Sequence, residues 1–300
     1  MTDQVGVIGL GVLGSAIAEV LLKNKFVVLG YDTDQSKTDL LVEMGMLEAT
    51  SPKNVMENSS TVLTCLPSVE ALFSVISSVD GLLEADKSET IVIDVSTLPL
   101  DEKFRAHDLL SDAGIILMDC PVSGNRIMAL NGELTAFASG IPGGFDKVKS
   151  VLEGFCQVVH YVGPFGDGMK MKLCGNILNL VHNSVAAEVM ILGMKSGLDA
   201  KLIHKVISGS GSSSRMFDVR GGLMAENDYA KEGMNFSVPL KDARIISDHA
   251  AKLLCPTPIY QAALQPYFAA VAQGYADLDA SAVLKALENA ANFDREADIS

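Results

Sequence analysis

The chain has 300 residues, of which 48% are hydrophobic, and its 37 acidic and 23 basic residues give a formal net charge of −14. A chain of this length can bury a substantial core in one large domain or two ordinary ones. The acidic balance argues against nucleic acid and anionic membranes as partners, because both repel a negatively charged surface.

The first stretch of the chain, Val5–Glu19, predicts a strand, a tight turn and a helix. An apolar run ends in Gly9, Gly11 and Gly14, spaced as G-x-G-x-x-G, and apolar residues follow at helical spacing. We expect Gly9 to allow a sharp turn, Gly11 to let the backbone approach a pyrophosphate, and Gly14 to let the helix pack closely on the strand. The start of such a helix favours phosphate, because its unpaired N–H groups and its dipole attract anions. The motif predicts a dinucleotide site, although an ordinary glycine-rich turn can have the same spacing.

Asp32 ends the second predicted strand, which covers residues 26–31. It lies about 20 residues beyond the glycines, where a carboxylate can accept hydrogen bonds from an adenosine ribose. A carboxylate there would repel a 2′-phosphate, and Thr33 stands where an NADP enzyme would be expected to have a phosphate-binding arginine. The sequence therefore favours NAD over NADP. Lys37 is close enough to weaken that preference, and Asp32 could instead be only a turn or cap residue.

From Asp32 to about residue 163, short apolar runs alternate with helical stretches. Helices are expected over residues 36–44, 70–77, 101–113 and 145–155 and from Ser51-Pro52, and strands over residues 61–66, 90–95, 115–119, 134–139 and 158–162. This alternation predicts a doubly wound, mostly parallel α/β sheet with helices on both faces. Ligands bind such sheets beyond the carboxyl ends of the strands. The residues to consider there are Leu66, Pro67, Ser96, Thr97, Pro121, Val122, Ser123 and Gly124.

Beyond the glycine-rich segment 163–168 the sequence predicts only helices. Met169–Ser196 has no proline and is followed by Gly197, so it predicts one long helix. Asp199 is expected to cap a helix over residues 200–207, followed by a flexible Ser/Gly loop over residues 208–214 and helices around 240–254, 259–273 and 281–291. We therefore expect a dinucleotide-binding domain at residues 1–164. An all-helical substrate and oligomerisation domain is expected at residues 165–300.

One polar stripe runs along the long predicted helix. Lys172, Asn176, Asn179 and Asn183 are spaced at i, i+4, i+7 and i+11, and most other positions are apolar. A solvated face is the ordinary explanation, but the helix is too apolar elsewhere for a surface helix. Lys172 also lies in its first turns, where the two domains are expected to meet. Lys170 lies about 200° away around the helix, so the two lysines cannot address one site.

The cysteines and histidines indicate neither disulfides nor a metal site. Five cysteines, an odd number, are scattered without a Cys-x-x-Cys pair, and five histidines are equally scattered. We expect reduced core thiols in a cytoplasmic protein. No apolar run reaches the ~20 residues of a membrane-spanning helix. Because the first predicted strand begins so near residue 1, we expect no signal peptide.

Four motifs in this order resemble those of the β-hydroxyacid dehydrogenase family, over nearly the whole chain. The glycine loop resembles the family's cofactor loop, and residues 119–124 its D-x-P-V-S-G substrate motif. Lys172 and Asn176 stand in a G-x-G-x3-K-x3-N catalytic motif, and Lys241-Asp242 in a K-D pair. Two departures fall at the substrate end. Asn125, followed by Arg126, replaces the usual second glycine, and Phe236 is about two residues too close to the K-D pair.

The resemblance implies a Rossmann-type domain followed by an all-helical domain, as in 6-phosphogluconate dehydrogenase-like proteins, and a homodimer or homotetramer. It implies a small hydroxy acid as substrate and a nicotinamide dinucleotide as cofactor, for which Asp32 favours NAD. The implied cofactor contacts are Gly9, Leu10, Gly11, Val12, Leu13, Gly14, Asp32, Leu66, Pro67, Thr97 and Lys241. The implied substrate contacts are Ser123, Gly124, Asn125, Lys172 and Asn176, with Lys172, Asn176 and Ser123 as catalytic residues.

The chemistry of these residues suits hydride transfer. Lys172 can take or return the hydroxyl proton if burial and the positive charge of oxidised nicotinamide bring its pKa from about 10.4 towards 7–8. Asn176 can hold the lysine and the substrate hydroxyl in register, and Ser123 with the Gly124 N–H can bind a carboxylate. A catalytically silent dinucleotide-binding scaffold or sensor, or an imine reductase, remains the alternative. The segment Ser208–Phe217 is expected to touch the substrate. Arg126, Arg215 and Arg220 are candidates for a second acidic group or for structural ion pairs.

Overall fold

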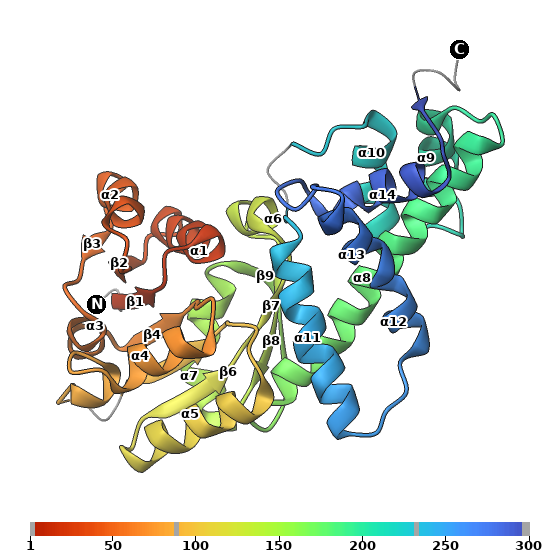
Figure 1. The fold of residues 1–300 in the computed structure, drawn as a ribbon. Helices are drawn as coiled ribbons and strands as arrows, with labels where there is room; N and C mark the ends of the chain where they lie inside the picture. The colour runs from red at the N-terminus through yellow and green to blue at the C-terminus, as the bar shows by residue number, and fades with distance from the viewer. Residues whose placement is uncertain (1–3, 87–89, 231–233, 296–300) are drawn as a thin grey trace. The chain divides into compact units, whose positions relative to one another are not determined.

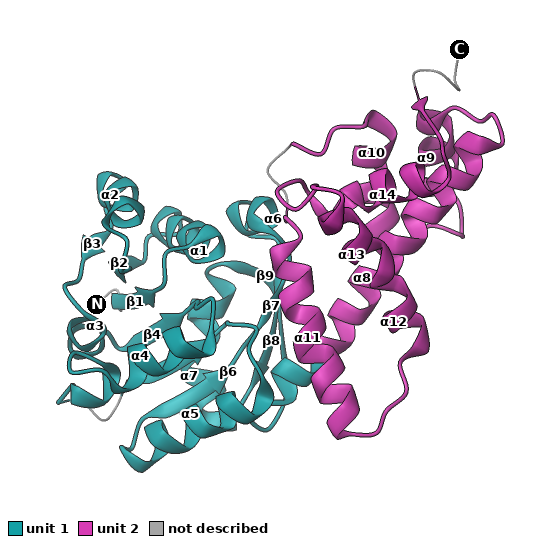
Figure 2. Ribbon diagram, in the orientation of Figure 1, with its two compact units in different colours: residues 1–172 teal, residues 173–300 magenta. Residues whose placement is uncertain are grey.

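The computed structural model describes residues 4–86, 90–230 and 234–295 of the chain. It divides into two compact units, residues 1–172 and residues 173–300 (Figure 2). The division falls inside one continuous helix, α8 (Asp167–Lys195). The boundary predicted from the sequence, between residues 164 and 165, lies just before this helix begins.

Unit 1 is built on a nine-stranded sheet (Figure 1). Its pairs are parallel except that β8 runs antiparallel to β6 and to β7. The chain winds outward from β1 in both directions, so the strand order reverses between β1 and β4. In spatial order the strands are β3 (Leu47–Glu48), β2 (Val27–Tyr31), β1 (Gln4–Ile8), β4 (Thr61–Thr64), β5 (Ile91–Asp94), β6 (Ile116–Asp119), β8 (Leu134–Ser139) and β7 (Val122–Ser123), with β9 (Cys156–Gly163) beside β8.

Helices cover both faces of this sheet because alternate strand residues point to opposite sides. On β5, Ile91 and Ile93 belong to the core cluster that contains residues of α1 and α7, and Val92 belongs to the cluster that contains residues of α3, α4 and α5. The predicted doubly wound fold is therefore confirmed. The helices are α1 (Val12–Lys23), α2 (Gln35–Glu43), α3 (Pro52–Asn58), α4 (Val69–Ser77), η1 (Leu82–Glu84), α5 (Leu100–Asp112), α6 (Arg126–Leu130) and α7 (Pro142–Glu153).

In the described part of unit 2 the regular elements are all helices, apart from one isolated bridge between Asn235 and Asp279, and irregular segments connect them. Asp199 caps α9 as predicted, since its side chain accepts the backbone N–H of Leu202 at 2.8 Å. Besides α8, the unit contains α9 (Ala200–Ser208), α10 (Arg215–Glu226), α11 (Ser237–Lys252), α12 (Pro258–Ala263), α13 (Gln265–Ala272), η2 (Ala280–Ala282) and α14 (Val283–Ala290).

Several predicted boundaries are wrong in detail. The loop predicted over residues 208–214 begins one residue later, because α9 extends to Ser208. The longer segment expected to touch the substrate, residues 208–217, is helical from Arg215, because Ser214 caps α10 by accepting the Phe217 N–H. The helix expected over residues 259–273 is two helices, and Pro266, near the start of the second, cannot donate the N–H that would continue the first. The two-residue β7 and the five-residue α6 were not predicted, since elements this short carry little periodicity.

Among the described helices, α8 alone is long and apolar enough, by length and composition, to cross a membrane. The sequence contains no apolar run of that length, but polar residues are sparse along this helix. Two of them, Asn183 and Ser184, are buried and bonded to other parts of unit 2, namely to Tyr267, Ala280 and Ala263. These contacts are those of the core helix of a helical domain.

The cysteines are free, but the expectation that all five are core thiols is wrong. Cys120 and Cys156 are buried and Cys65 is partly buried, whereas Cys174 and Cys255 are exposed. Burial raises the pKa of the Cys156 thiol to about 12, and burial also raises that of Cys120. Neither buried thiol is therefore suited to act as a nucleophile at neutral pH.

Candidate active site

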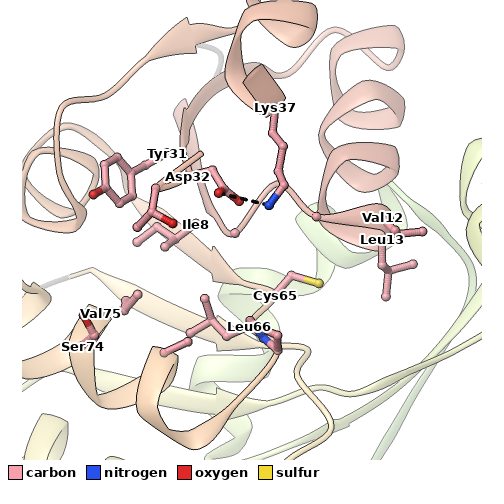
Figure 3. Close-up of a pocket in the computed structure, with 15 residues that line it drawn as sticks. Ile8, Val12, Leu13, Tyr31, Asp32, Lys37, Cys65, Leu66, Ser74 and Val75 are labelled. Atoms are coloured by element: carbon pink, nitrogen blue, oxygen red, sulfur yellow. Dashed lines mark hydrogen bonds and ion pairs between the residues drawn. The ribbon is translucent and has the colours of Figure 1, made fainter. Parts of the chain in front are cut away.

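A cavity of about 380 Å³ opens in unit 1 at the carboxyl ends of β1, β2 and β4, where the strand order reverses (Figure 3). This is the position at which doubly wound sheets bind ligands. The cavity brings together the glycine loop, the residues that end β2, and the segment after β4. Of the residues predicted to bind a cofactor, it is lined by Gly9, Gly11, Val12, Leu13, Asp32, Leu66 and Pro67.

The three glycines have the geometry that the motif requires. Gly9 has a φ of +90°, and Gly14 lies so close to the loop that an added Cβ would stand 1.9 Å from the Gly9 carbonyl oxygen. A Cβ on Gly11, by contrast, would meet nothing within 4 Å. Gly11 directly precedes the first turn of α1, so the backbone N–H groups of that turn are accessible to a ligand at this point. The loop and the cavity beside it therefore fit a dinucleotide pyrophosphate.

Asp32 connects the end of β2 to the glycine loop. Its Oδ2 accepts the Leu10 N–H at 2.7 Å, and its Oδ1 accepts the Asp34 N–H at 2.9 Å. Asp32 thus does serve as a turn residue, while it also lines the cavity. The ammonium of Lys37 lies 3.5 Å from Asp32 Oδ1, and Figure 3 shows the two side chains directed at each other. The cavity therefore holds one acidic and one basic group at the place where the sequence favours an adenosine ribose.

The segment after β4 forms another wall of the cavity. Leu66 donates its backbone N–H to the buried hydroxyl of Ser96 at 2.8 Å, so a residue beyond β5 holds it in place. Thr97, the next residue, lies in the same segment after β5. Lys241 lies in unit 2, on α11, where its ammonium is 3.3 Å from the Asp242 carboxylate.

The predicted substrate segment is a tight turn between β7 and α6. Ser123 ends β7 and pairs with Thr135 of β8, and Gly124 follows with a φ of +140°. Asn125 is the N-cap of α6, because its Oδ1 accepts the Met128 N–H at 3.0 Å. An asparagine in place of a glycine therefore has a local structural reason.

Arg126 begins α6 and attaches it to α1. Its guanidinium donates to the Val12 carbonyl and the Ser15 hydroxyl, each at 3.2 Å. Both acceptors lie in the first turns of α1, beside the glycine loop. Arg220 is buried in α10 of unit 2. Burial raises the pKa of the Tyr267 hydroxyl, and the charge of Arg220 offsets part of that rise.

The start of α8 is anchored to the sheet of unit 1. The Gly168 N–H donates to Ser139 Oγ at 2.9 Å, and the Met169 N–H donates to Asp119 Oδ2 at 2.8 Å. Lys172, half-buried, follows one turn later. Lys170 is exposed and pairs with Asp167 at 2.8 Å, so the two lysines have different surroundings, as their angular separation predicts.

Within unit 2, Asn176 is held by a residue that the sequence analysis did not assign to the site. Its Nδ2 donates to Asp242 Oδ2 at 2.8 Å, and Asp242 is buried. A carboxylate only accepts hydrogen bonds, so this contact fixes which end of the Asn176 amide is the nitrogen. The sequence did offer a sign of this role, because Asp242 is the acidic residue of the K-D pair. The polar stripe is not one solvated face throughout, since Asn179 is exposed whereas Asn183 is fully buried and bonds to Tyr267 and Ala280.

Asp94, Asp119 and Lys103 form a second group of charged residues that the sequence analysis did not place together. Lys103 is buried against both carboxylates. In the sequence, Asp94 and Asp119 each follow an apolar run, and this pattern could have indicated that they lie together. The position of Lys103 on a helix gave no sign that it is buried. Among the described residues, no group of three or more His, Cys, Asp or Glu could hold a metal ion.

Comparisons with known proteins decide the family. Residues 4–163 match the model of the NAD binding domain of 6-phosphogluconate dehydrogenase, and residues 166–287 match the model described as NAD-binding of NADP-dependent 3-hydroxyisobutyrate dehydrogenase. The chain belongs to the 3-hydroxyisobutyrate dehydrogenase family. Within this β-hydroxyacid dehydrogenase family it is an NAD(P)-dependent oxidoreductase, and the resemblance inferred from the four motifs is confirmed.

Individual relatives agree with this assignment over almost the entire chain. The mitochondrial 3-hydroxyisobutyrate dehydrogenase of Rattus norvegicus is 31% identical over 296 residues, covering 96% of this chain and 88% of that protein. The NAD-dependent L-serine dehydrogenase of Pseudomonas aeruginosa is 30% identical over 289 residues, covering 94% and 97%. The crystal structure of 3-hydroxyisobutyrate dehydrogenase from Salmonella typhimurium has a TM-score of 0.85 at 26% identity, covering 94% and 99%. The relatives share a family but differ in substrate.

Proposed function

We propose that this member of the family oxidises a small 3-hydroxy acid, or reduces the matching semialdehyde, with Lys172 as the general acid/base. The observation that carries the proposal is the placement of Lys172 and Asn176 one turn apart on α8, with the Asn176 amide oriented by buried Asp242. Because Nδ2 is committed to Asp242, Oδ1 is the end of the amide that can accept a proton donor. A lysine ammonium or a substrate hydroxyl is such a donor.

In this proposal the chain's residues bind the carboxylate of the substrate and transfer its hydroxyl proton. A bound nicotinamide would supply the hydride acceptor, or the hydride in the reverse direction. Ser123 and the N–H of Gly124 bind the substrate carboxylate, and Asn176 orients the hydroxyl. Lys172 accepts the hydroxyl proton as the C–H hydride leaves, so a carbonyl forms and the ammonium keeps the proton. In reduction the ammonium returns that proton to the carbonyl oxygen.

For the cofactor we propose NAD as the preferred dinucleotide. The carboxylate of Asp32 at the cavity supports this preference, because it suits a ribose hydroxyl and repels a 2′-phosphate. Lys37 lines the same cavity and lies beside Asp32. Its positive charge offsets part of that repulsion, so we expect NADP to be accepted less well rather than rejected.

The two alternatives both fail to account for Lys172. A silent scaffold or sensor needs the glycine loop and Asp32 but has no use for a lysine and an oriented asparagine on one helix face. An imine reductase on this fold typically lacks the lysine. Turnover of hydroxy acids distinguishes the three possibilities.

Lys172→Ala and Lys170→Ala form a matched pair that tests the proposal. Both remove an ammonium near the start of α8, but Lys170 is exposed and paired with Asp167. With a panel of about a dozen hydroxy acids, and with NAD and NADP in separate assays, we expect Lys172→Ala to lower kcat at least 100-fold, the lower end of what a positioned acid/base contributes. Lys170→Ala should retain wild-type kcat within about twofold, since its ion pair is at the surface.

Three results would count against the proposal. Loss of activity in Lys170→Ala alone would show that the wrong lysine was assigned. Absence of NADH or NADPH formation with every acid in the panel would favour the scaffold. A higher kcat/KM with NADP than with NAD would reverse the cofactor preference.

We also propose that the protein works as a homodimer or homotetramer. Leu178, Val185 and Leu192 recur every seven residues along α8 and are all exposed, so they form one apolar stripe on a helix of unit 2. A second copy of the chain, presenting the same stripe, is the occupant that would bury it.

A further inference from the structure

A row of polar residues crosses the carboxyl ends of four neighbouring strands in unit 1. Thr64 of β4, Asp94 of β5, Asp119 of β6 and Ser139 of β8 are paired one with the next in the strand register. Each of the four is at most 1% exposed. Two carboxylates in such a dry environment require a cation, a proton or many hydrogen-bond donors, because an isolated buried charge is very costly.

Lys103 of α5 provides the cation. Its side chain is 0% exposed, and its Nζ lies 3.0 Å from Asp94 Oδ2 and 2.5 Å from Asp119 Oδ1. The third contact is to the Ser96 carbonyl oxygen, at 2.9 Å. An ammonium has three N–H donors, and here three acceptors surround it. Burial alone would lower the pKa of Lys103, but the carboxylates of Asp119 and Asp94 outweigh burial and raise that pKa above its ordinary value.

One branch of this network leads to α8. The second oxygen of Asp119 accepts the Met169 N–H, and Ser139 Oγ accepts the Gly168 N–H. Both N–H groups belong to the first turn of α8, which has no acceptors within its own helix. The carboxylate also suits the positive end of the helix dipole. Lys172 projects from the next turn of this anchored helix.

The other branch leads to the cavity. Asp94 Oδ1 accepts the Thr64 hydroxyl at 2.9 Å and the Ser96 N–H at 3.2 Å. Ser96 Oγ in turn accepts the N–H of Leu66, which lines the cavity. Lys103 therefore stands at the junction of two chains of contacts. One reaches α8, which carries Lys172, and the other reaches Leu66 in the wall of the cavity.

We propose that Lys103 is a positioning residue that holds these two parts of the site in fixed places through separate carboxylates. Through Asp119 it fixes the first turn of α8, and through Asp94 and Ser96 it fixes the backbone of Leu66. The consequence for catalysis rests on the proposed role of Lys172, whereas the anchoring of α8 and Leu66 does not. If Lys103 only stabilised the fold, its replacement would speed amide exchange throughout unit 1. It would not act on these two segments in particular.

The test is amide hydrogen exchange resolved to single residues, combined with steady-state kinetics, on the full chain. Lys103→Gln should speed exchange at Met169 and at Leu66 at least tenfold and lower kcat at least tenfold. Asp119→Asn should speed exchange at Met169 but leave Leu66 within about twofold. Ser96→Ala should do the reverse. These two variants also carry the test if Lys103→Gln fails to fold.

Met56→Ala is the control for general loss of stability. Met56 is fully buried in α3, on the face of the sheet that also packs α5, and it lies outside the polar network. Its truncation should destabilise unit 1. The exchange rates at Met169 and Leu66, relative to other slow amides of the sheet, should stay within about twofold of wild type, and so should kcat.

Two outcomes would overturn the proposal. One is that Lys103→Gln changes exchange at Met169 and Leu66 no more than Met56→Ala does at equal loss of stability. The other is that Asp119→Asn and Ser96→Ala affect both segments alike. If Lys172→Ala proves active while the branch-specific exchange is observed, the proposed function fails and the positioning network stands.

Discussion

Gly11 and Gly14 belong to the same glycine loop but face opposite surroundings, and this difference can be measured. An alanine at Gly14 would place its Cβ 1.9 Å from the Gly9 carbonyl oxygen, whereas one at Gly11 would meet nothing within 4 Å. Gly11 also has an ordinary extended backbone, with a φ of −65°. Gly14 is therefore required by the fold, and Gly11 leaves room for a ligand.

We expect Gly14→Ala to lower the free energy of unfolding by about 3 kcal/mol, because the backbone must move to remove the overlap. Gly11→Ala should leave that free energy within about 0.5 kcal/mol of wild type and raise the Kd for NAD at least tenfold, since its methyl group would stand where the pyrophosphate approaches. Urea unfolding and calorimetric titration with NAD check both. Wild-type NAD affinity in Gly11→Ala would show that the dinucleotide does not approach this loop.

Asp32 and Lys37 show how much a single residue's role can be read from sequence. Asp32 lines the cavity at the carboxyl ends of the strands, and its alternative role in a turn is observed. Its contact with an adenosine ribose stays a prediction. The 3.5 Å approach of Lys37 could not be derived from spacing alone. Helix α2, on which Lys37 lies, decides where its side chain reaches.

At the scale of elements, α8 combines three functions along its length. Its first turn is bonded to the sheet of unit 1, its second and third turns carry Lys172 and Asn176, and its middle is packed into unit 2 through Asn183. The polar stripe predicted from the sequence is therefore several different environments in succession. One repeat in the sequence does not imply one role, because each turn meets different neighbours.

Asn183 and Asn179 separate the structural from the exposed members of that stripe. Asn183→Ala would leave the Tyr267 hydroxyl and the Ala280 carbonyl without their present partner, so we expect a loss of about 3 kcal/mol in the free energy of unfolding. Asn179 is exposed, and its side-chain hydrogen bond to Asn176 is long at 3.4 Å. Asn179→Ala should stay within about 0.5 kcal/mol of wild type in the same urea titration. Equal effects in the two variants would contradict this division.

At the scale of the whole molecule, the apolar stripe on α8 makes self-association testable. Single exposed apolar residues are normal on a protein surface, but Leu178, Val185 and Leu192 share one face of one helix, and Leu192 is 71% exposed. Contiguous exposed apolar surface of this kind marks interaction sites.

We expect the wild-type chain to sediment as a dimer or tetramer, and the Leu178→Glu/Leu192→Glu variant to sediment as a smaller species. Two buried carboxylates at an interface would oppose its formation. Ile259→Glu is the matched control, since Ile259 is also 71% exposed but lies on α12. If the double variant sediments like the wild type, the stripe is not the interface.

The sequence by itself determined the strand–glycine–helix loop, the alternation that makes the doubly wound sheet, the long helix and the family motifs. These features depend on residues close together in the chain, where periodicity, glycine and capping act directly. It also identified Lys172 as distinct from Lys170, because helix geometry alone sets the angle between them.

Only the tertiary structure decided which charged residues are buried together. Lys103 lies near the start of a helix whose neighbours are charged, and nothing local distinguishes it from a solvated lysine. The pairing of β5 with β6 puts Asp94 beside Asp119, and the packing of α5 against that edge brings the ammonium between them. The same holds for Asp242, which meets Asn176 from 66 residues away. Burial and long-range pairing set the strength of a charge interaction, and both are properties of the folded chain.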